Sequence, residues 1–184
     1  SMAGYEDYLF ACAGASIWTY DGATLGTIAF PDGANVIKVL VGSGRLIALR
    51  SDTEKFYYSD PLAATIGALN FATAENQPDR LRDMIFIKDA LVLGGAETVE
   101  LWPNTNDDVL PFQPLEGAVW KVGVKNTGAM CNYGTTFAVV TSNNQIVLGD
   151  QDAVISNAGL EAEIEASTNA YLFTFLIDGS EFLA

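Results

Sequence analysis

Short apolar stretches recur along the chain, and each is followed by a turn and a second stretch that carries a large side chain. The openings of these stretches are YLFA, RLIA, ALVL, TFAV and YLFT, and they begin at residues 8, 45, 90, 136 and 171. Successive openings are 35 to 46 residues apart, near the period of about 40 to 50 residues that is typical of propeller blades. The pattern predicts one β-rich unit that occurs four times, with a partial fifth.

The spacing between large apolar residues is also repeated. In each unit, a large apolar residue lies 11 positions after the first large apolar residue of the opening strand. We expect the first members of these pairs to occupy equivalent buried positions, and the second members to lie on the returning strands. The predicted structural core of the repeat consists of the pairs Leu9 and Tyr20, Leu46 and Tyr57, Leu91 and Trp102, Phe137 and Leu148, and Leu172 and Leu183.

The segments between these hairpins also have the composition of strands, separated by residues that favour turns. Outer strands are predicted at 25–30, 66–71, 109–112 and 153–156, inner strands at 36–41, 81–87 and 119–124, and a short helix at 159–166. The predicted fold class is all-β: a propeller-like array of four-stranded antiparallel blades that forms a single domain over residues 1–184. A non-repeating sandwich or barrel is the alternative.

The last predicted hairpin, residues 170–183, is apolar, and the chain ends inside its returning strand. Unpaired strand edges tend to associate with other strands. We therefore expect the sequence to be a fragment of a longer protein, truncated at the C-terminal end. We also expect the hairpin either to complete the first unit, around residues 5–20, or to pair with a second copy of the chain.

The composition excludes several classes of function. The chain has no histidine, which excludes Ser-His-Asp and Cys-His nucleophile systems and zinc sites that need histidine. Its 23 acidic residues outnumber nine Lys and Arg, the formal net charge is −14, and the cations form no stripe. Nonspecific DNA affinity depends on cations that release counterions from phosphates, so we expect no direct nucleic-acid binding. Nor do we expect a membrane association, because no apolar run approaches the about 20 residues of a membrane span.

The remaining candidate motifs have simpler structural interpretations. Residues 42–47 (GSGRLI) begin like a phosphate-binding loop, but a third glycine is absent and a strand follows, which predicts a hairpin turn. The acids at 107–108 and 150–152 do not continue into a calcium-binding loop. The alternating acids of 161–165 would need an aromatic cleft and a defined separation for glycoside hydrolysis. We predict no catalytic residue, no metal site and no cofactor.

Two further residue types have more than one interpretation. Cys12 and Cys131 lie far apart in apolar contexts, which predicts two buried, reduced thiols. A row of aromatic residues on predicted strands could bind a sugar, but packing between sheets is the commoner use of such residues. This row consists of Trp18, Tyr20, Tyr57, Tyr58, Trp102 and Trp120.

Two stretches carry a resemblance to a known family. Residues 56–75 (FYYSDPLAATIGALNFATAE) are followed by PDR at 78–80, and residues 91–117 contain LVLGGAETVELWPNT and PFQPLEG. This succession resembles the packaged-DNA stabilisation proteins of short-tailed bacteriophages, the tail hub or nozzle component (tail accessory factor), across residues 36–184. There are two departures: Asn106 and Asp107 stand where the family has a glycine, and AVWKVG at 118–123 replaces a basic or Glu-Arg-Gly segment. They affect partner-contact residues rather than the fold.

The resemblance implies a non-enzymatic structural protein of the virion, made in the cytoplasm of the bacterial host. It implies a homo-oligomer, a hexamer, that joins below the portal and adaptor rings and closes the DNA exit channel with a tail needle or fibre. A channel wall of negative potential would let DNA pass without adhering to it. A carbohydrate- or protein-binding propeller module of a tail or surface assembly is the alternative, and an isolated enzyme is a third class.

Overall fold

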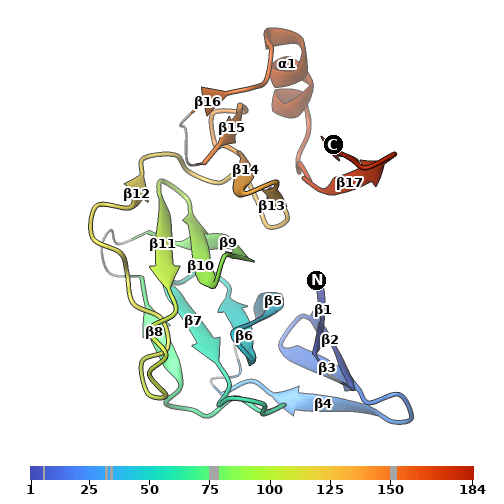
Figure 1. Cartoon of the computed structure of the whole chain (residues 1–184), viewed down its shortest axis with the longest axis vertical. Coiled ribbons are helices and arrows are strands. Elements are labelled where there is room, and N and C mark those ends of the chain that lie inside the picture. Colours follow the sequence, from blue (N-terminus) through green and yellow to red (C-terminus); the bar gives the residue numbers. More distant parts are fainter. Residues whose placement is uncertain (6, 32, 34, 75–78, 150–152) are drawn as a thin grey trace.

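The computed structural model describes residues 1–184 except residues 6, 32, 34, 75–78 and 150–152. Its described residues form 18 strands and one short helix (Figure 1). Sixteen of these strands make four antiparallel sheets of four strands each, and within each sheet the strands lie in sequence order. The last two strands form a separate hairpin. The predicted all-β array of four-stranded units with a partial fifth is confirmed.

Each sheet is a simple meander of consecutive strands. The first sheet consists of β1 (Met2–Tyr5), β2 (Tyr8–Ala13), β3 (Ser16–Tyr20) and β4 (Leu25–Ala29). The second consists of β5 (Val36–Gly42), β6 (Arg45–Arg50), β7 (Lys55–Tyr58) and β8 (Phe71–Thr73). The third consists of β9 (Leu81–Ile87), β10 (Ala90–Gly95), β11 (Val99–Pro103) and β12 (Val119–Trp120). The fourth consists of β13 (Met130–Tyr133), β14 (Thr136–Val140), β15 (Ile146–Leu148) and β16 (Ala153–Val154), and is followed by α1 (Ala158–Ala166), β17 (Thr174–Ile177) and β18 (Ser180–Leu183).

The four sheets follow one another around an open arc. The first strand of each sheet lies on the inside of the arc, where β1 contacts β5, β5 contacts β9, and β9 contacts β13. Figure 1 shows the outermost strands β4, β8, β12 and β16 on the periphery and both termini on the open side. A radial arrangement of meanders with inner strands around a common centre is that of a β-propeller.

Most predicted strand positions agree with the structure, and three do not. The strands β4, β5 and β9 and the helix α1 lie at their predicted positions. However, β8 begins only at Phe71, the last residue of its predicted segment. Residues 109–112 are not an outer strand, and the segment predicted as an inner strand at 119–124 instead supplies the outer strand β12. The long β11–β12 loop accounts for the last two differences: it places Phe112 between the second and third sheets, leaves Val109 and Leu110 exposed, and delays the fourth strand of the sheet to residue 119.

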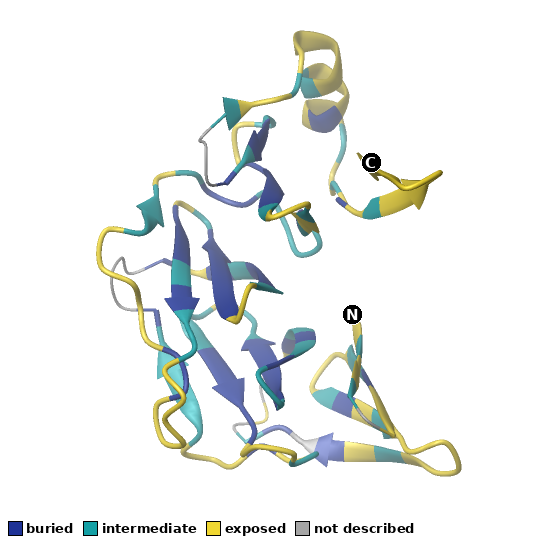
Figure 2. Ribbon diagram, in the orientation of Figure 1, coloured by how far each residue is buried: buried dark blue, intermediate teal, exposed yellow. Residues whose placement is uncertain are grey.

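The core lies between neighbouring sheets rather than within a single one (Figure 2). Three clusters of buried side chains fall between the first and second, the second and third, and the third and fourth sheets. Second strands such as β6 and β10 are therefore covered on both faces, and nearly every residue in them is buried. This explains why their sequences are continuous apolar runs rather than an alternation.

The paired core residues of the repeat occupy unequal positions. Leu91 lies directly opposite Trp102, and both are buried. Leu9 also lies opposite Tyr20, but these side chains are 45% and 42% exposed, so the prediction of equivalent buried positions is wrong for the first unit. The first sheet has a neighbouring sheet on one face only, and Leu9 is on the other.

The spacing of 11 residues does not give the same cross-strand pairing in every unit. Tyr57 pairs with Ala48 rather than with Leu46, although Leu46 and Tyr57 are both buried. Leu148 pairs with Ala138 rather than with Phe137. Leu183 pairs with Thr174, and Leu172 precedes the strand. The hairpin loops differ in length, and a change of one or two residues moves the pairing even where the apolar pattern is kept.

We predict that Leu91→Ala lowers the free energy of unfolding by about 2 to 5 kcal/mol, because it removes a fully buried side chain between two sheets. Leu9→Ala is the matched control, since the same substitution at the exposed equivalent position should cost less than about 1 kcal/mol. Urea denaturation monitored by circular dichroism measures both values. Equal losses would contradict this description of the core.

Candidate functional site

A fully buried carboxylate lies where three sheets meet. Asp83 is on the inner strand β9, and its side chain has no exposure to solvent. Its Oδ1 accepts hydrogen bonds from Nζ of Lys38 on β5, at 2.6 Å, and from the backbone N–H of Met84, at 2.9 Å. Its Oδ2 accepts from the backbone N–H groups of Gly128, at 3.0 Å, and Met130 on β13, at 2.9 Å. One carboxylate therefore joins the second, third and fourth sheets.

The environment of Asp83 combines opposing electrostatic effects. Burial raises the pKa of Asp83, while Lys38 and the backbone N–H donors act to lower it. Sequence reasoning missed this residue. The available signal was an acid on the buried face of an apolar strand, since Asp83 alternates with Leu81 and Ile85 in β9. An acid at such a position needs partners, and here they come from two other sheets.

The motifs that carry the family resemblance have structural roles of the same kind. Asp79 accepts hydrogen bonds from the backbone N–H groups of three consecutive residues, 96–98, at 2.7 to 2.8 Å, and so closes the β10–β11 turn. A side chain at Gly95 would collide with Asp79, because its Cβ would lie 2.2 Å from Oδ2. Glu100 is buried and accepts from Nε1 of Trp102 at 3.0 Å. Pro78, the other half of the PD motif, lies outside the described residues.

The SDP motif fixes the end of β7. Ser59 is buried; its Oγ accepts from the backbone N–H of Leu46, at 3.0 Å, and donates to the carbonyl of Asp60, at 2.8 Å. Arg45, also buried, donates to the carbonyl of Ser59 at 2.9 Å. The Asp60 carboxylate accepts from the side chain of Asn70 at 2.9 Å. The motif therefore joins segments that are distant in the sequence and leaves its polar groups engaged in internal bonds.

The other acidic candidates are not brought together. Asp107 stabilises a tight turn, and hydrogen bonds from the N–H groups of Leu110 and Val109 lower the pKa of its carboxyl. Residues 150–152 lie outside the described residues. The acids of 161–165 lie on the helix α1 rather than on a strand, where Glu161 accepts from Ser156 at 2.7 Å. Within the described part of the chain, no three metal-ligating side chains cluster.

Two further candidates have ordinary structural roles. Residues 42–47 form the β5–β6 hairpin, with Ser43 and Gly44 at positive φ in its turn. Cys12 and Cys131 are free thiols, as predicted, but both are half-buried rather than buried. Burial raises the pKa of Cys131 to about 11, so its thiol is protonated near neutral pH. No helix among the described residues is long and apolar enough to span a membrane.

A hollow of about 390 Å³ lies at the centre of the arc. The inner strands β1, β5 and β9 line it, with Asn132 of β13 at its side. Lys38 is the one ionisable side chain among its described lining residues, and it is already paired with Asp83. Among the described lining residues, the centre of the arc therefore holds no constellation of acids and bases.

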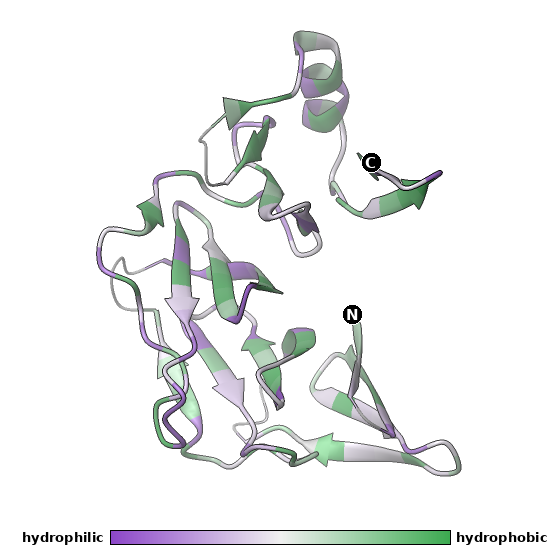
Figure 3. Cartoon of the chain, viewed as in Figure 1, coloured by the Kyte–Doolittle hydropathy of each residue, from purple (hydrophilic) through white to green (hydrophobic). Residues whose placement is uncertain are grey.

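Two sets of exposed large apolar side chains lie at the two ends of the arc (Figures 2 and 3), and others lie singly or in pairs on the loops and peripheral elements between them. The first-sheet patch consists of Met2, Tyr8, Leu9, Trp18, Tyr20 and Leu25, each at least 40% exposed. The hairpin patch consists of Tyr171, Phe173, Phe175, Leu176, Ile177 and Phe182, each at least 39% exposed. Of the predicted aromatic row, only Trp18 and Tyr20 lie in these patches; the others are buried or half-buried between sheets.

The hairpin β17–β18 does not complete the first unit. The first sheet has four strands of its own, and β17 and β18 pair only with each other in the described residues. They lie beside the fourth sheet, where the N–H of Leu172 donates to the carbonyl of Gly128 at 2.9 Å and Glu181 accepts from the N–H of Gly134 at 2.6 Å. The prediction of completion within the chain is therefore wrong, because the hairpin continues the order of the sheets around the arc.

These features define a class: a β-propeller protein whose buried polar groups hold sheets together and whose exposed apolar surfaces are free for assembly. Residues 1–178 match the protein family described as Bacteriophage P22 Gp10, beta-propeller, and the chain belongs to this family of packaged-DNA stabilisation proteins. It is therefore a structural protein of the bacteriophage virion. The family match begins at residue 1, whereas the resemblance seen in the sequence motifs begins at residue 36.

Solved structures support the same fold. The chain superposes on the computationally designed Ika4 protein with a TM-score of 0.57 and 14% identity, over 80% of this chain and 87% of Ika4. It superposes on YCF48 from Cyanidioschyzon merolae with a TM-score of 0.59 and 8% identity, over 100% of this chain and 65% of YCF48. It superposes on AztD of Citrobacter koseri with a TM-score of 0.50 and 9% identity, over 100% of this chain and 45% of AztD. No curated protein matches the chain.

We predict that Asp83→Ala lowers the free energy of unfolding by about 3 to 5 kcal/mol, because it leaves the partly buried ammonium of Lys38 and the backbone N–H groups without their acceptor. The double variant Asp83→Leu with Lys38→Met should recover most of this loss. Glu163→Ala, an exposed acid on α1, is the control and should change stability by less than about 0.5 kcal/mol. A loss below about 1 kcal/mol for Asp83→Ala would refute the role of this carboxylate as the joint between sheets.

Proposed function

We propose that this protein is a non-enzymatic component of the phage tail that joins the assembly below the portal and adaptor, closes the DNA exit channel and helps to retain the packaged DNA. The observation that carries the proposal is the family match over residues 1–178, which accompanies a propeller fold. The proposal extends to a single structural unit over residues 1–184, a hexameric ring in the virion, and contacts with a needle or fibre.

The distribution of charge supports a passive role toward DNA. Several of the nine cations are engaged in hydrogen bonds within the chain, among them Lys38 with Asp83, Arg45 with Ser59 and Asp108, Arg82 with two carbonyl groups, and Lys125 with Asn144 and a carbonyl group. Arg80, Lys88 and Lys121 are exposed, but they lie on a surface with many more acids. A protein of this kind can surround DNA without binding its backbone.

The two apolar patches support a role in assembly. Monomeric soluble proteins seldom expose several large apolar side chains side by side, and such patches commonly mark interaction surfaces. Here they lie at opposite ends of the arc, so one copy can present two different surfaces to its neighbours. Association through unlike surfaces generates a ring when the rotation closes. A dimer formed through the hairpin β17–β18 is the other form of assembly that we propose.

A carbohydrate-binding role for the first sheet is the second candidate. Trp18 and Tyr20 are two residues apart on β3, so they lie on the same face of the sheet, and each is more than 40% exposed. Exposed aromatic rings on one face can stack against sugar rings. Retention on a glycan array that is lost in Trp18→Ala would support this role.

The location in the particle can be tested directly. We expect electron microscopy of the parent virion to place this propeller in a ring below the portal, around the DNA exit channel. Finding it at the tip of a fibre, or not finding it in the particle, would overturn the tail-channel role.

We further predict that the purified chain does not bind duplex DNA. A titration of fluorescently labelled duplex at low salt should show no micromolar affinity, because the acidic surface lacks the cations that release counterions. A variant in which the two exposed acids of α1 are reversed, Glu163→Lys with Glu165→Lys, is a positive control for the assay. Micromolar binding of the unmodified chain that weakens steeply with added salt would contradict the passive-channel role.

A further inference from the structure

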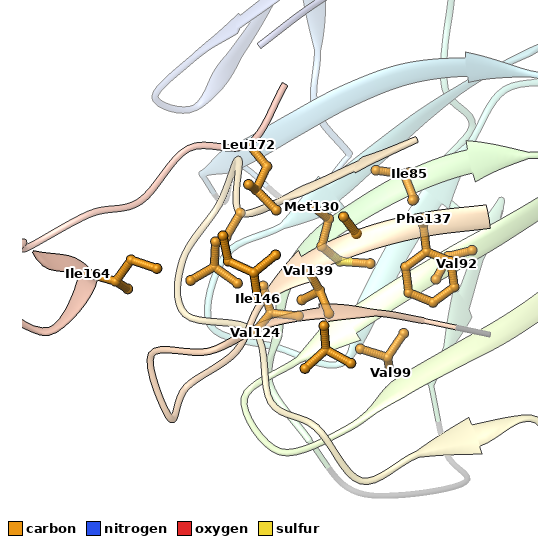
Figure 4. Packing of buried hydrophobic residues seen from close by; sticks show 14 residues of the cluster. Ile85, Val92, Val99, Val124, Met130, Phe137, Val139, Ile146, Ile164 and Leu172 are labelled. Carbon is orange, nitrogen blue, oxygen red and sulfur yellow. The ribbon is translucent and has the colours of Figure 1, made fainter. Parts of the chain in front are cut away.

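A hollow of about 340 Å³ opens between the third and fourth sheets. Val92 of β10, Leu101 of β11, Trp120 of β12 and Phe137 of β14 line it. The rings of Trp120 and Phe137 meet edge to face, with 5.6 Å between their centroids. Figure 4 shows Phe137 directed toward Val92 across this interface. The hollow is lined largely by aliphatic and aromatic side chains, which suits an apolar side chain rather than a polar ligand.

The equivalent space between the second and third sheets has an occupant within the chain. Ile47 and its cross-strand partner Tyr58 are the counterparts of Val92 and Leu101, because both pairs lie at the same place in the second and third strands of their sheets. The ring of Phe112 is 6.5 Å from the ring of Tyr58. Phe112 is 2% exposed, so the β11–β12 loop inserts an aromatic side chain between these two sheets.

An ion pair also attaches the loop that carries Phe112 to the second sheet. The carboxylate of Asp108, four residues before Phe112, pairs with the buried Arg45 at 3.2 Å. The carbonyl of Val109 accepts a hydrogen bond from the hydroxyl of Tyr58 at 2.7 Å. On one irregular segment, an aromatic side chain thus fills the interface between the second and third sheets, and an exposed acid pairs with a cation at its edge.

The hollow between the third and fourth sheets offers the same two features. Its walls accept an apolar side chain, and Lys88, in the β9–β10 turn, lies at its edge. Lys88 is exposed on a chain with a net charge of −14, and no ion pair occupies it in the described residues. A cation beside an apolar hollow is complementary to a segment that carries both a carboxylate and an aromatic ring.

We infer that this hollow is a docking site for a peptide segment of a partner protein, in which an aromatic side chain enters between the third and fourth sheets and a nearby carboxylate pairs with Lys88. The partner segment has the chemistry of the chain's own β11–β12 loop: an aspartate about four residues before a phenylalanine. The site would serve the proposed assembly role, but it does not depend on where in the virion the chain resides.

The probe is a synthetic peptide with the sequence of residues 107–114, DDVLPFQP, acetylated and amidated at its ends. Titration into the full chain by calorimetry, with the indole N–H of Trp120 followed by NMR, measures affinity and location together. We expect binding that shifts the Trp120 resonance. Replacing the phenylalanine of the peptide by alanine should weaken binding about tenfold or more.

Variants of the chain separate this site from the exposed patches. Lys88→Glu should weaken binding several-fold at low salt, whereas Lys121→Glu makes the same charge change on an exposed lysine outside the hollow and should leave binding unchanged. Thr135→Trp, at the exposed rim, should block entry. Circular dichroism shows that each variant is folded before it is used.

Three outcomes would overturn the inference: no binding of the peptide, binding that is insensitive to both Lys88→Glu and Thr135→Trp, or resonance shifts confined to the first-sheet or hairpin patch. Because the assay uses only the purified chain, its failure would leave the tail role standing. Equally, a different position of the chain in the particle would leave the docking site standing.

Discussion

The sheets of this protein have apolar faces that need to be buried, and most of that burial comes from a neighbouring sheet. Every large cluster of buried side chains therefore lies between two sheets. This requirement fixes the order of the sheets around the arc, turns the second strands into continuous apolar runs, and leaves the outward faces at the two ends exposed. Asp83 adds direction to this otherwise nonspecific attraction, because its four hydrogen bonds are satisfied only when three sheets meet at one position.

The repeat and the strand content could be predicted from the sequence because they depend on local pattern. The runs that begin at residues 45 and 90 are apolar enough to identify buried strands without any knowledge of their neighbours. The pairing of Tyr57 with Ala48 could not be obtained in this way, because one or two loop residues change which side chains face one another. The prediction that Leu9 is buried was wrong for a different reason, since the burial of this residue depends on a neighbouring sheet and not on its own strand.

The candidate sites show the same division. The absence of histidine and the excess of acidic residues follow directly from the composition, and both are compatible with a family of structural proteins. The buried joint at Asp83 and the insertion of Phe112 both connect residues more than 40 positions apart, and nothing local in the sequence specifies the partners. Residues 109–112 of the β11–β12 loop have the local apolar pattern of a strand, but Val109 and Leu110 are exposed and Phe112 packs into the interface between the second and third sheets.

The way in which the sheets are joined gives the arc an uneven mechanical stiffness. Asp83 pairs with Lys38 of the second sheet and accepts a hydrogen bond from the backbone N–H of Met130 in the fourth, and the β11–β12 loop adds an ion pair between Asp108 and Arg45. The first sheet is attached to the second by apolar packing and by hydrogen bonds such as those of Val39 with Ser1 and Val36 with Gly14. A force that opens the arc would therefore meet its softest joint between the first two sheets, and the other three would turn as one body. Such a chain can change its own curvature at one boundary while keeping the rest of its surface unchanged.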